Sequence, residues 1–189
     1  MKVLVMAGGS GERFWPLSTK EKPKQLLTLI SSKSMIRETV DRVLNYVEPK
    51  DIYVATNKIQ SEGIISELKD IPENNVIIEP AFKDTAAAIA YGSLIISRDS
   101  DKDEVIAVLA SDHLIANLDG FIQSLKIAEE TAIEGYVATL GIKPSRPETG
   151  YGYIQLNNLN LNQPSKAIRF MEKPNLETAI EYLEQGNYI

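Results

Sequence analysis

The chain opens with the stretch Lys2–Arg13, KVLVMAGGSGER, and this stretch decides the fold class. Its first half, Lys2–Ala7, is a short apolar run, which predicts a buried β-strand. Its second half is rich in glycine, which lets the backbone turn with its N–H groups facing outward. The glycines are Gly8, Gly9 and Gly11. A concave row of such amides binds anions, so the sequence predicts a phosphate-binding loop directly after the first strand.

Two basic residues strengthen this prediction. Arg13 ends the glycine-rich stretch, and Lys24 follows in the run Pro23-Lys24-Gln25. Fixed positive charge beside the loop favours a phosphorylated ligand. The loop is neither a Walker A loop, which needs Gly-Lys-Ser/Thr, nor a dinucleotide fingerprint, because Phe14 stands where the third glycine belongs. The alternative is an ordinary tight turn between a strand and a helix.

Apolar strands alternate with helical patterns along the chain. The predicted strands are Lys2–Ala7, Asp51–Thr56, Asn75–Glu79, Val105–Ala110 and Tyr136–Ile142. The predicted helices are Ser34–Tyr46, Ile59–Leu68, Asp84–Ser97 and Phe121–Glu134. Val105–Leu109 is apolar on both faces, which is typical of a central parallel strand covered by helices on both sides. The alternation predicts an α/β fold with a doubly wound, mostly parallel open sheet, which binds ligands beyond the carboxyl ends of its strands.

The sequence changes in character after Gly141. Residues 143–150, KPSRPETG, contain two prolines and a glycine, which predicts a loop. Two further strands are predicted over Tyr151–Leu156 and Ala167–Glu172. A final helix is predicted from a cap at Asn175 to Gly186, a residue type that often terminates helices.

Composition excludes several classes of protein. The 189 residues are 43% hydrophobic and 24% charged, which is ordinary for a soluble globular domain. A net charge of −6 argues against a general nucleic-acid surface, and no apolar stretch approaches the roughly 20 residues that span a bilayer. With no cysteine, the chain has no disulfide, thiolate metal site or cysteine nucleophile. We expect a cytoplasmic protein that binds neither nucleic acid nor membrane.

Three further places carry candidate chemistry, each with a structural alternative. Asp112 follows a predicted strand directly, where a carboxylate can hold Mg²⁺ against phosphate oxygens or can cap a turn. Glu79 ends another strand and can present acceptors to a nucleobase, although Asp84 or Thr85 beyond it can simply cap a helix. The pair Glu172-Lys173 suits a sugar phosphate or a solvated surface.

Several motifs, whose order and spacing run through almost the whole chain, carry a resemblance to a known family. They are Ala7–Ser18 (AGGSGERFWPLS), Pro23–Gln25, Glu79-Pro80, Thr85-Ala86, Ser111–His113, Thr149–Ile154 and Glu172–Pro174. Together they resemble the sugar-1-phosphate nucleotidyltransferases, and within them the mannose-1-phosphate guanylyltransferases. Trp15-Pro16 and Pro23–Gln25 are similar to the guanylyl branch, whereas related thymidylyl enzymes usually have Tyr-Pro and Ser-Lys-Gln.

The resemblance implies a Rossmann-like nucleotidyltransferase fold in which mannose 1-phosphate attacks the α-phosphorus of GTP, giving GDP-mannose and pyrophosphate. The catalytic residues it implies are Arg13 on the departing phosphates, Lys24 on the α-phosphoryl group and Asp112 on Mg²⁺. The nucleotide-binding residues it implies are Ala7, Gly8, Gly9, Gly11, Arg13, Lys24, Glu79, Thr85 and Ser111. The sugar-phosphate-binding residues it implies are Gly150, Glu172 and Lys173.

The resemblance also implies how the chain is divided. Residues 1–189 form one catalytic domain, with a nucleotide-binding βα core at 1–142 and the start of the sugar-phosphate-binding part at 143–189. Family catalytic domains continue into a further strand and a second metal-binding aspartate, so we expect an incomplete domain. The expected partners are GTP and mannose 1-phosphate, with a homodimer as a further expectation. Two alternatives are another sugar-1-phosphate nucleotidyltransferase, thymidylyl or uridylyl, and a nucleotide-binding module without turnover.

Overall fold

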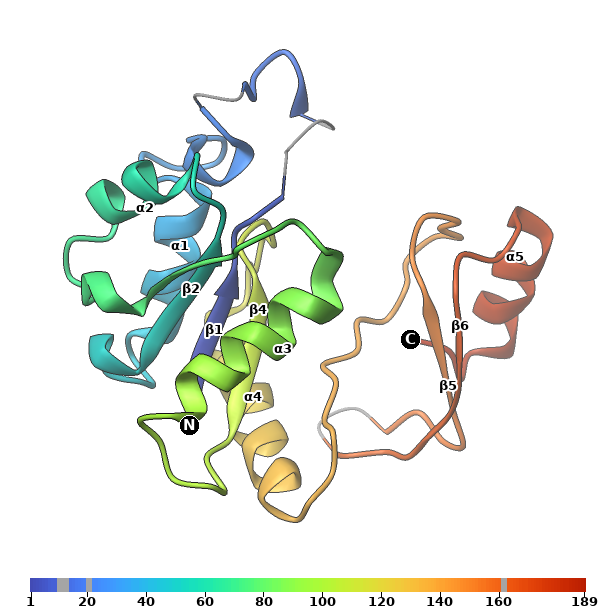
Figure 1. Ribbon diagram of the computed structural model, residues 1–189. Coiled ribbons are helices and arrows are strands. Elements are labelled where there is room, and N and C mark those ends of the chain that lie inside the picture. Colours follow the sequence, from blue (N-terminus) through green and yellow to red (C-terminus); the bar gives the residue numbers. More distant parts are fainter. Residues whose placement is uncertain (10–13, 20–21, 161–162) are drawn as a thin grey trace. The chain divides into compact units, whose positions relative to one another are not determined.

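Four strands pair in parallel in the order β3-β2-β1-β4. They are β1 (Lys2–Met6), β2 (Ile52–Thr56), β3 (Val76–Ile78) and β4 (Ile106–Ala110). The computed structural model describes residues 1–9, 14–19, 22–160 and 163–189, and it divides into two compact units, Met1–Ile122 and Gln123–Ile189 (Figure 1). The four-stranded sheet lies in the first unit.

Helices connect these strands as the alternating pattern predicts. The first unit contains α1 (Met35–Val43), α2 (Ser61–Glu67) and α3 (Asp84–Ser97), and α4 (Leu118–Ile133) runs across the boundary between the units. Short 3₁₀ helices also lie in the connections between the described elements, among them η2 (Lys24–Leu26), η3 (Pro49–Asp51) and η4 (Glu73–Asn75). The chain moves outward from β1 to β3 and then returns through α3 to β4. The predicted doubly wound α/β fold is therefore confirmed.

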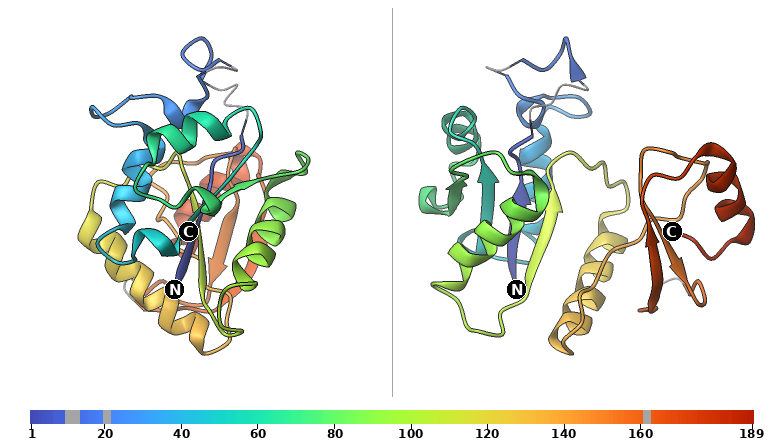
Figure 2. Two further views of the ribbon diagram at one scale, coloured as in Figure 1. Left: turned by 60° about the vertical axis from the view of Figure 1, so that its left-hand side comes forward. Right: turned by 45° about the vertical axis from the view of Figure 1, so that its right-hand side comes forward.

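Strand β1 is the buried centre of the sheet. Val3, Leu4 and Val5 are all fully buried, because helices lie on both faces of the sheet: α3 on one and α1 on the other (Figures 1 and 2). Leu4 belongs to the cluster on the α3 side, where its methyl groups lie so close to Gly92 that a Cβ there would come within 2.6 Å. Successive side chains alternate between the faces of a strand, so Val3 and Val5 face the other way.

The strand order fixes where a ligand is expected. The connections from β1 lead to one side of the sheet, whereas β4 pairs on the other side, so the order reverses between β1 and β4. In doubly wound folds ligands bind beyond the carboxyl ends of the strands at such a reversal. The segments that leave those two ends begin at Ala7 and Ser111.

Two predictions about strands are wrong. Val105–Leu109 is not central: β4 is the last strand of the sheet, and Val108 remains 38% exposed because the described residues place no further strand beside it. Tyr136–Ile142 is not a strand, because a strand needs a neighbour to satisfy its backbone and no described residue pairs with it. Val137 within it is 98% exposed.

The second unit has its own sheet and core. β5 (Tyr153–Leu156) and β6 (Ala167–Met171) pair antiparallel, and α5 (Leu176–Gln185) follows. The predicted cap is confirmed, since Asn175 Oδ1 accepts a hydrogen bond from the Thr178 N–H at 2.8 Å, and Gly186 ends the helix at a φ of 71°. The core consists of Tyr153, Ala179, Tyr182 and Tyr188. No helix among the described residues has the length and apolar character needed to cross a membrane.

Candidate functional site

The glycine loop, which we define as Ala7–Gly9, leaves the carboxyl end of β1. Ala7 is buried, and its N–H donates to the Ala55 carbonyl at 2.8 Å, so the loop starts from a fixed point. Gly8 and Gly9 are half-buried. The predicted contributions of Gly11 and Arg13 lie outside the described residues.

Side chains from three other segments hold the carbonyl groups of the glycine loop. Gln25 Nε2 donates to the Ala7 carbonyl at 2.7 Å and to the Gly9 carbonyl at 3.2 Å. Thr56 Oγ1 also donates to the Ala7 carbonyl, at 3.2 Å. Asn57 Nδ2 donates to the Gly8 carbonyl at 3.1 Å, and Gln60 Nε2 to the Gly9 carbonyl at 3.2 Å. All three carbonyls of the loop therefore have side-chain donors.

This arrangement also directs the N–H groups of the loop. In a planar trans peptide the N–H points opposite to the carbonyl of the preceding residue. Because the Ala7 carbonyl faces Gln25 and the Gly8 carbonyl faces Asn57, the N–H groups of Gly8 and Gly9 point away from these side chains. The N–H groups of Gly8 and Gly9 are therefore not directed at the side chains that hold the loop, which leaves them available to an anion.

Glu79 lies directly beside the glycine loop. Its own N–H donates to the Thr56 carbonyl at 2.8 Å, and a Cβ added to Gly8 would stand 2.6 Å from Glu79 Oε1. A side chain at position 8 would therefore require the Glu79 carboxylate to move. Burial raises the pKa of the Glu79 carboxyl above its ordinary value.

The first turn of α3 tests the alternative that Asp84 or Thr85 simply caps the helix. The N-cap position is Lys83, and its side chain forms no capping hydrogen bond. Asp84 has a φ of 60°, and Thr85 is exposed on the first turn. Neither side chain has a hydrogen-bond partner among the described residues, so the interpretation of Asp84 or Thr85 as a helix cap is wrong.

Lys24 and Asp112 meet beside the same loop. Lys24 Nζ forms a short hydrogen-bonded ion pair with Asp112 Oδ2, although 88 residues separate them. The Lys24 side chain also lies 3.7 Å from the position a Cβ would take on Gly9. Burial alone would raise the pKa of Asp112, but the hydrogen bond and positive charge of Lys24 lower it below its ordinary value. A cation and a carboxylate thus stand together at the reversal point of the sheet.

Backbone contacts fix the segment that carries Asp112. Ser111 is buried, its N–H donates to the Met6 carbonyl at 3.3 Å, and its carbonyl accepts from Thr39 Oγ1 at 3.3 Å. On the other side of Asp112, the His113 carbonyl accepts from Arg42 Nη2 at 2.9 Å. Helix α1 therefore contacts the segment on both sides of Asp112.

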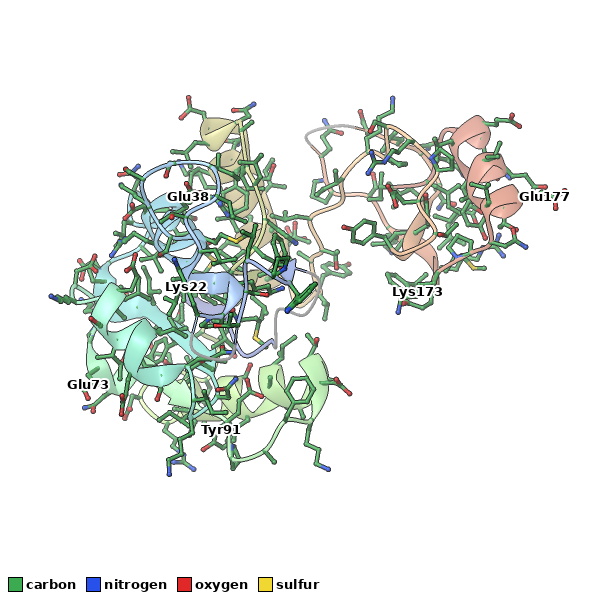
Figure 3. The ribbon with its side chains drawn as sticks, turned by 90° about the horizontal axis from the view of Figure 1, so that it is seen from above. Lys22, Glu38, Glu73, Tyr91, Lys173 and Glu177 are labelled. Carbon is green, nitrogen blue, oxygen red and sulfur yellow. The ribbon has the colours of Figure 1, made fainter. Side chains whose placement is uncertain are left out.

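The predicted sugar-phosphate residues gather at one end of the second unit's hairpin. Tyr153 pairs with Met171, so the turn that includes Gly150 lies at the same end as Glu172 and Lys173. Glu172 and Lys173 form an exposed ion pair at 3.1 Å, and Lys173 is labelled in Figure 3. A Cβ on Gly150 would meet nothing within 4 Å. These residues share an open, charged end of the hairpin.

The sequence analysis missed the side chains that hold the backbone of the site. These are Gln25, Thr39, Arg42, Asn57 and Gln60. One signal was available for Asn57 and Gln60. Both follow β2, and polar residues that follow a strand parallel and adjacent to β1 lie near the carboxyl end of β1. Gln25 itself stood in a motif, but its complete burial beneath the glycine loop is visible only in three dimensions.

The described residues contain no group of three or more His, Cys, Asp or Glu side chains that could hold a metal ion. Asp112 nevertheless offers one carboxylate at the end of β4. Magnesium in proteins is commonly bound by one or two carboxylates together with substrate phosphates and water. The donor set therefore fits a magnesium ion that arrives with a phosphorylated ligand.

Comparisons with known proteins agree with this geometry. The family described as Nucleotidyl transferase matches residues 2–189. A mannose-1-phosphate guanylyltransferase of Klebsiella pneumoniae is 40% identical over 190 residues, which cover 98% of this chain and 40% of that protein. The chain thus spans about two fifths of the length of this relative.

Solved structures are similar to this chain over nearly its whole length. A Thermus thermophilus structure described as a mannose-1-phosphate geranyltransferase superposes with a TM-score of 0.88 and 34% identity, over 99% of this chain and 54% of that one. A Helicobacter pylori structure described as a mannose-6-phosphate isomerase superposes with a TM-score of 0.78 and 29% identity, over 99% of this chain and 66% of that one. The match of nearly every residue to the family, together with the sheet and the residues gathered at its reversal point, shows that the chain belongs to the nucleotidyl transferase family.

Proposed function

We propose that this chain carries the nucleotide-binding part of a mannose-1-phosphate guanylyltransferase. In the proposed reaction a phosphate oxygen of mannose 1-phosphate forms a bond to the α-phosphorus of GTP. The bond from the α-phosphorus to the bridging oxygen breaks, and pyrophosphate leaves with the electron pair. The observation that carries the proposal is the meeting of Lys24 and Asp112 beside the Gly8–Gly9 amides.

Both reactants are anions, so the main catalytic task is to remove charge repulsion. The N–H groups of Gly8 and Gly9 bind the nucleotide, together with Ala7 and Ser111, the first residues beyond β1 and β4. Lys24 stabilises the negative charge that collects on the α-phosphoryl group during transfer. Arg13 and Gly11 belong to the same proposal by sequence, on the departing phosphates and on the nucleotide.

Asp112 is the proposed ligand for Mg²⁺, which when bound supplies positive charge against the phosphate oxygens. In the free protein Lys24 neutralises this carboxylate. Lys24 and Asp112 are therefore close enough to act on the same phosphate group. No covalent nucleophile is required for this transfer.

Glu79 supports guanine as the base. An ionised carboxylate accepts hydrogen bonds and donates none, and the Watson–Crick edge of guanine offers two adjacent N–H donors. Uracil and thymine offer one donor between two carbonyl acceptors, which a carboxylate would repel. Thr85, exposed on the first turn of α3, is the second proposed residue near the base. Gly150, Glu172 and Lys173 are proposed for the sugar phosphate.

The test has two steps. Calorimetry compares the dissociation constants of GTP, dTTP and UTP in the presence of Mg²⁺. We expect GTP to bind tightest. Formation of GDP-mannose from mannose 1-phosphate, followed by ³¹P NMR, then tests transfer. Tighter binding of dTTP or UTP would support the thymidylyl or uridylyl alternative, and binding with no product would support a module without turnover.

A further inference from the structure

We propose that Arg42 and Thr39 of α1 are positioning residues for Asp112, acting through the backbone carbonyls on either side of it. The inference rests on the proposed function, in which Asp112 binds Mg²⁺ with the nucleotide. Arg42 and Thr39 do not contact Asp112 themselves. They hold the segment from which its carboxylate projects.

The contacts fasten this segment at three points. The Ser111 N–H donates to the Met6 carbonyl at 3.3 Å, which ties the segment to β1. The Ser111 carbonyl accepts from Thr39 Oγ1, a hydroxyl that also lies 3.0 Å from the Met35 carbonyl of its own helix. The His113 carbonyl accepts from Arg42 Nη2 at 2.9 Å. Asp112 is therefore the residue between two held carbonyls.

Burying the guanidinium charge of Arg42 costs free energy, which a purely structural contact would not require. It is only 9% exposed, and it forms no salt bridge with any described residue. Burial lowers the pKa of its guanidinium below the ordinary value, although Glu38 on the same helix, labelled in Figure 3, opposes this. The Phe121 ring lies 5.6 Å from the guanidinium carbon and gives partial compensation. A methionine would fill this space without burying a charge.

What the guanidinium adds is a rigid donor that reaches the His113 carbonyl. Peptide planes are stiff, and the Ser111 carbonyl lies in the plane directly before the Asp112 Cα, whereas the His113 carbonyl lies in the second plane after it. Holding both planes limits the backbone freedom of this segment to the rotations at Asp112 and His113. The direction of its Cα–Cβ bond follows from that backbone. A ligand of Mg²⁺ tolerates little misplacement, because magnesium demands near-ideal octahedral geometry.

The experiment compares four variants with wild type and one control. Arg42→Met and Thr39→Val remove the donors, whereas Arg42→Lys and Thr39→Ser retain a donor. Arg37→Met is the control, because Arg37 lies on the same helix but pairs with Asp41 and Asp70. Calorimetry gives the dissociation constant of GTP with Mg²⁺ and with EDTA, and hydrogen exchange follows the amide of Ser111 in the free protein.

We expect Arg42→Met to reduce the enhancement of GTP binding by Mg²⁺ on the order of tenfold, with affinity in EDTA unchanged. Thr39→Val should act in the same direction but less, since its hydroxyl is shared with Met35. Arg42→Lys and Thr39→Ser should recover part of the enhancement, and Arg37→Met should match wild type. The Ser111 amide should exchange faster in the variants that lose a donor.

A merely structural role gives a different result. If Ser111 exchanges faster in Arg42→Met but the Mg²⁺ enhancement is unchanged, the inference is wrong. An equal loss of GTP affinity with Mg²⁺ and with EDTA would also overturn it. Failure of the proposed function is recognised separately, because wild type itself would then show no Mg²⁺-dependent binding of GTP.

Discussion

At the scale of single residues, the ion pair between Lys24 and Asp112 connects the two segments that leave β1 and β4. Each member compensates the half-buried charge of the other. A phosphorylated ligand with its cation offers both residues a new partner of opposite charge. The pair is therefore suited to exchange partners when the nucleotide binds.

Replacement of Lys24 tests its role in transfer. We expect Lys24→Met to reduce the rate of GDP-mannose formation roughly 10²- to 10³-fold, because one donor to the developing charge is lost. The dissociation constant of GTP should change far less. Initial rates and calorimetry measure the two effects. Lys22→Met is the matched control, since Lys22 is exposed and labelled in Figure 3. A rate equal to that of wild type would refute this role of Lys24.

Glu79 allows a prediction about stability and pH. Its pKa is raised by burial, so the folded state disfavours the charged form. The contribution of this carboxyl to stability is full below its unfolded pKa and is lost as pH rises through the raised folded pKa. Glu79→Gln should therefore increase the free energy of unfolding at pH 7 and make little difference below about pH 4.

Urea denaturation at the two pH values measures this effect. Glu73→Gln serves as the control, because Glu73 is an exposed residue of η4 in the same unit, also labelled in Figure 3. We expect this control to leave stability unchanged at both pH values. The prediction is wrong if Glu79→Gln is equally stabilising at pH 4 and pH 7.

At the scale of elements, α3 packs on β1 through the close approach of Gly92 to Leu4. A Cβ at position 92 would come within 2.6 Å of a Leu4 methyl group, and Leu4 is fully buried among other core side chains. Alanine favours a helix over glycine by about 1 kcal/mol. Overpacking of a core costs about 1–3 kcal/mol, and here the second effect should dominate.

We therefore expect Gly92→Ala to lower the free energy of unfolding by about 1–2 kcal/mol, despite the better helix former. Leu4→Val removes the methyl groups in question. In that background Gly92→Ala should cost less than in wild type, and urea denaturation of the double-mutant cycle measures the difference. Strictly additive effects would show that the helix and strand do not compete for this space.

Elements with strong local signals were predicted well, and those that depend on neighbours were not. α5 was predicted with both ends, because Asn175 and Gly186 are local signals for the start and end of a helix. Tyr136–Ile142 has the composition of a strand but no described partner, and pairing is decided elsewhere in the chain. The edge position of β4 has the same cause, since apolar residues alone do not reveal which strands lie beside one another.

The residues of the candidate site differ in the same way: some were predicted from local signals, and others depend on which strands are neighbours. Glycines and charged residues such as Gly8, Lys24 and Asp112 carry recognisable chemistry, so sequence patterns single them out. Asn57 and Gln60 are ordinary polar residues whose role comes from the pairing of β2 beside β1. Their hydrogen bonds to the Gly8 and Gly9 carbonyls could not be predicted without the strand order.

At the scale of the whole molecule, the net charge of −6 should disfavour binding of a polynucleotide more than binding of a free nucleotide. A single local site can bind one triphosphate, whereas a polymer must also lie along a protein whose net charge is negative. We expect no binding of a single-stranded oligonucleotide of about twelve residues at 0.15 M salt, under conditions in which GTP binds. Fluorescence anisotropy of a labelled oligonucleotide measures this. Competition between the oligonucleotide and GTP would contradict it.

The glycine loop is held by donors that carry no charge. Gln25, Asn57 and Gln60 contribute amides and Thr56 a hydroxyl, and none of these groups gains or loses a proton between mild acid and mild base. These hydrogen bonds are therefore insensitive to pH. Any pH profile of ligand binding must originate in the ligand's phosphates or in neighbouring charged side chains such as Glu79, and not in the donors that hold the loop.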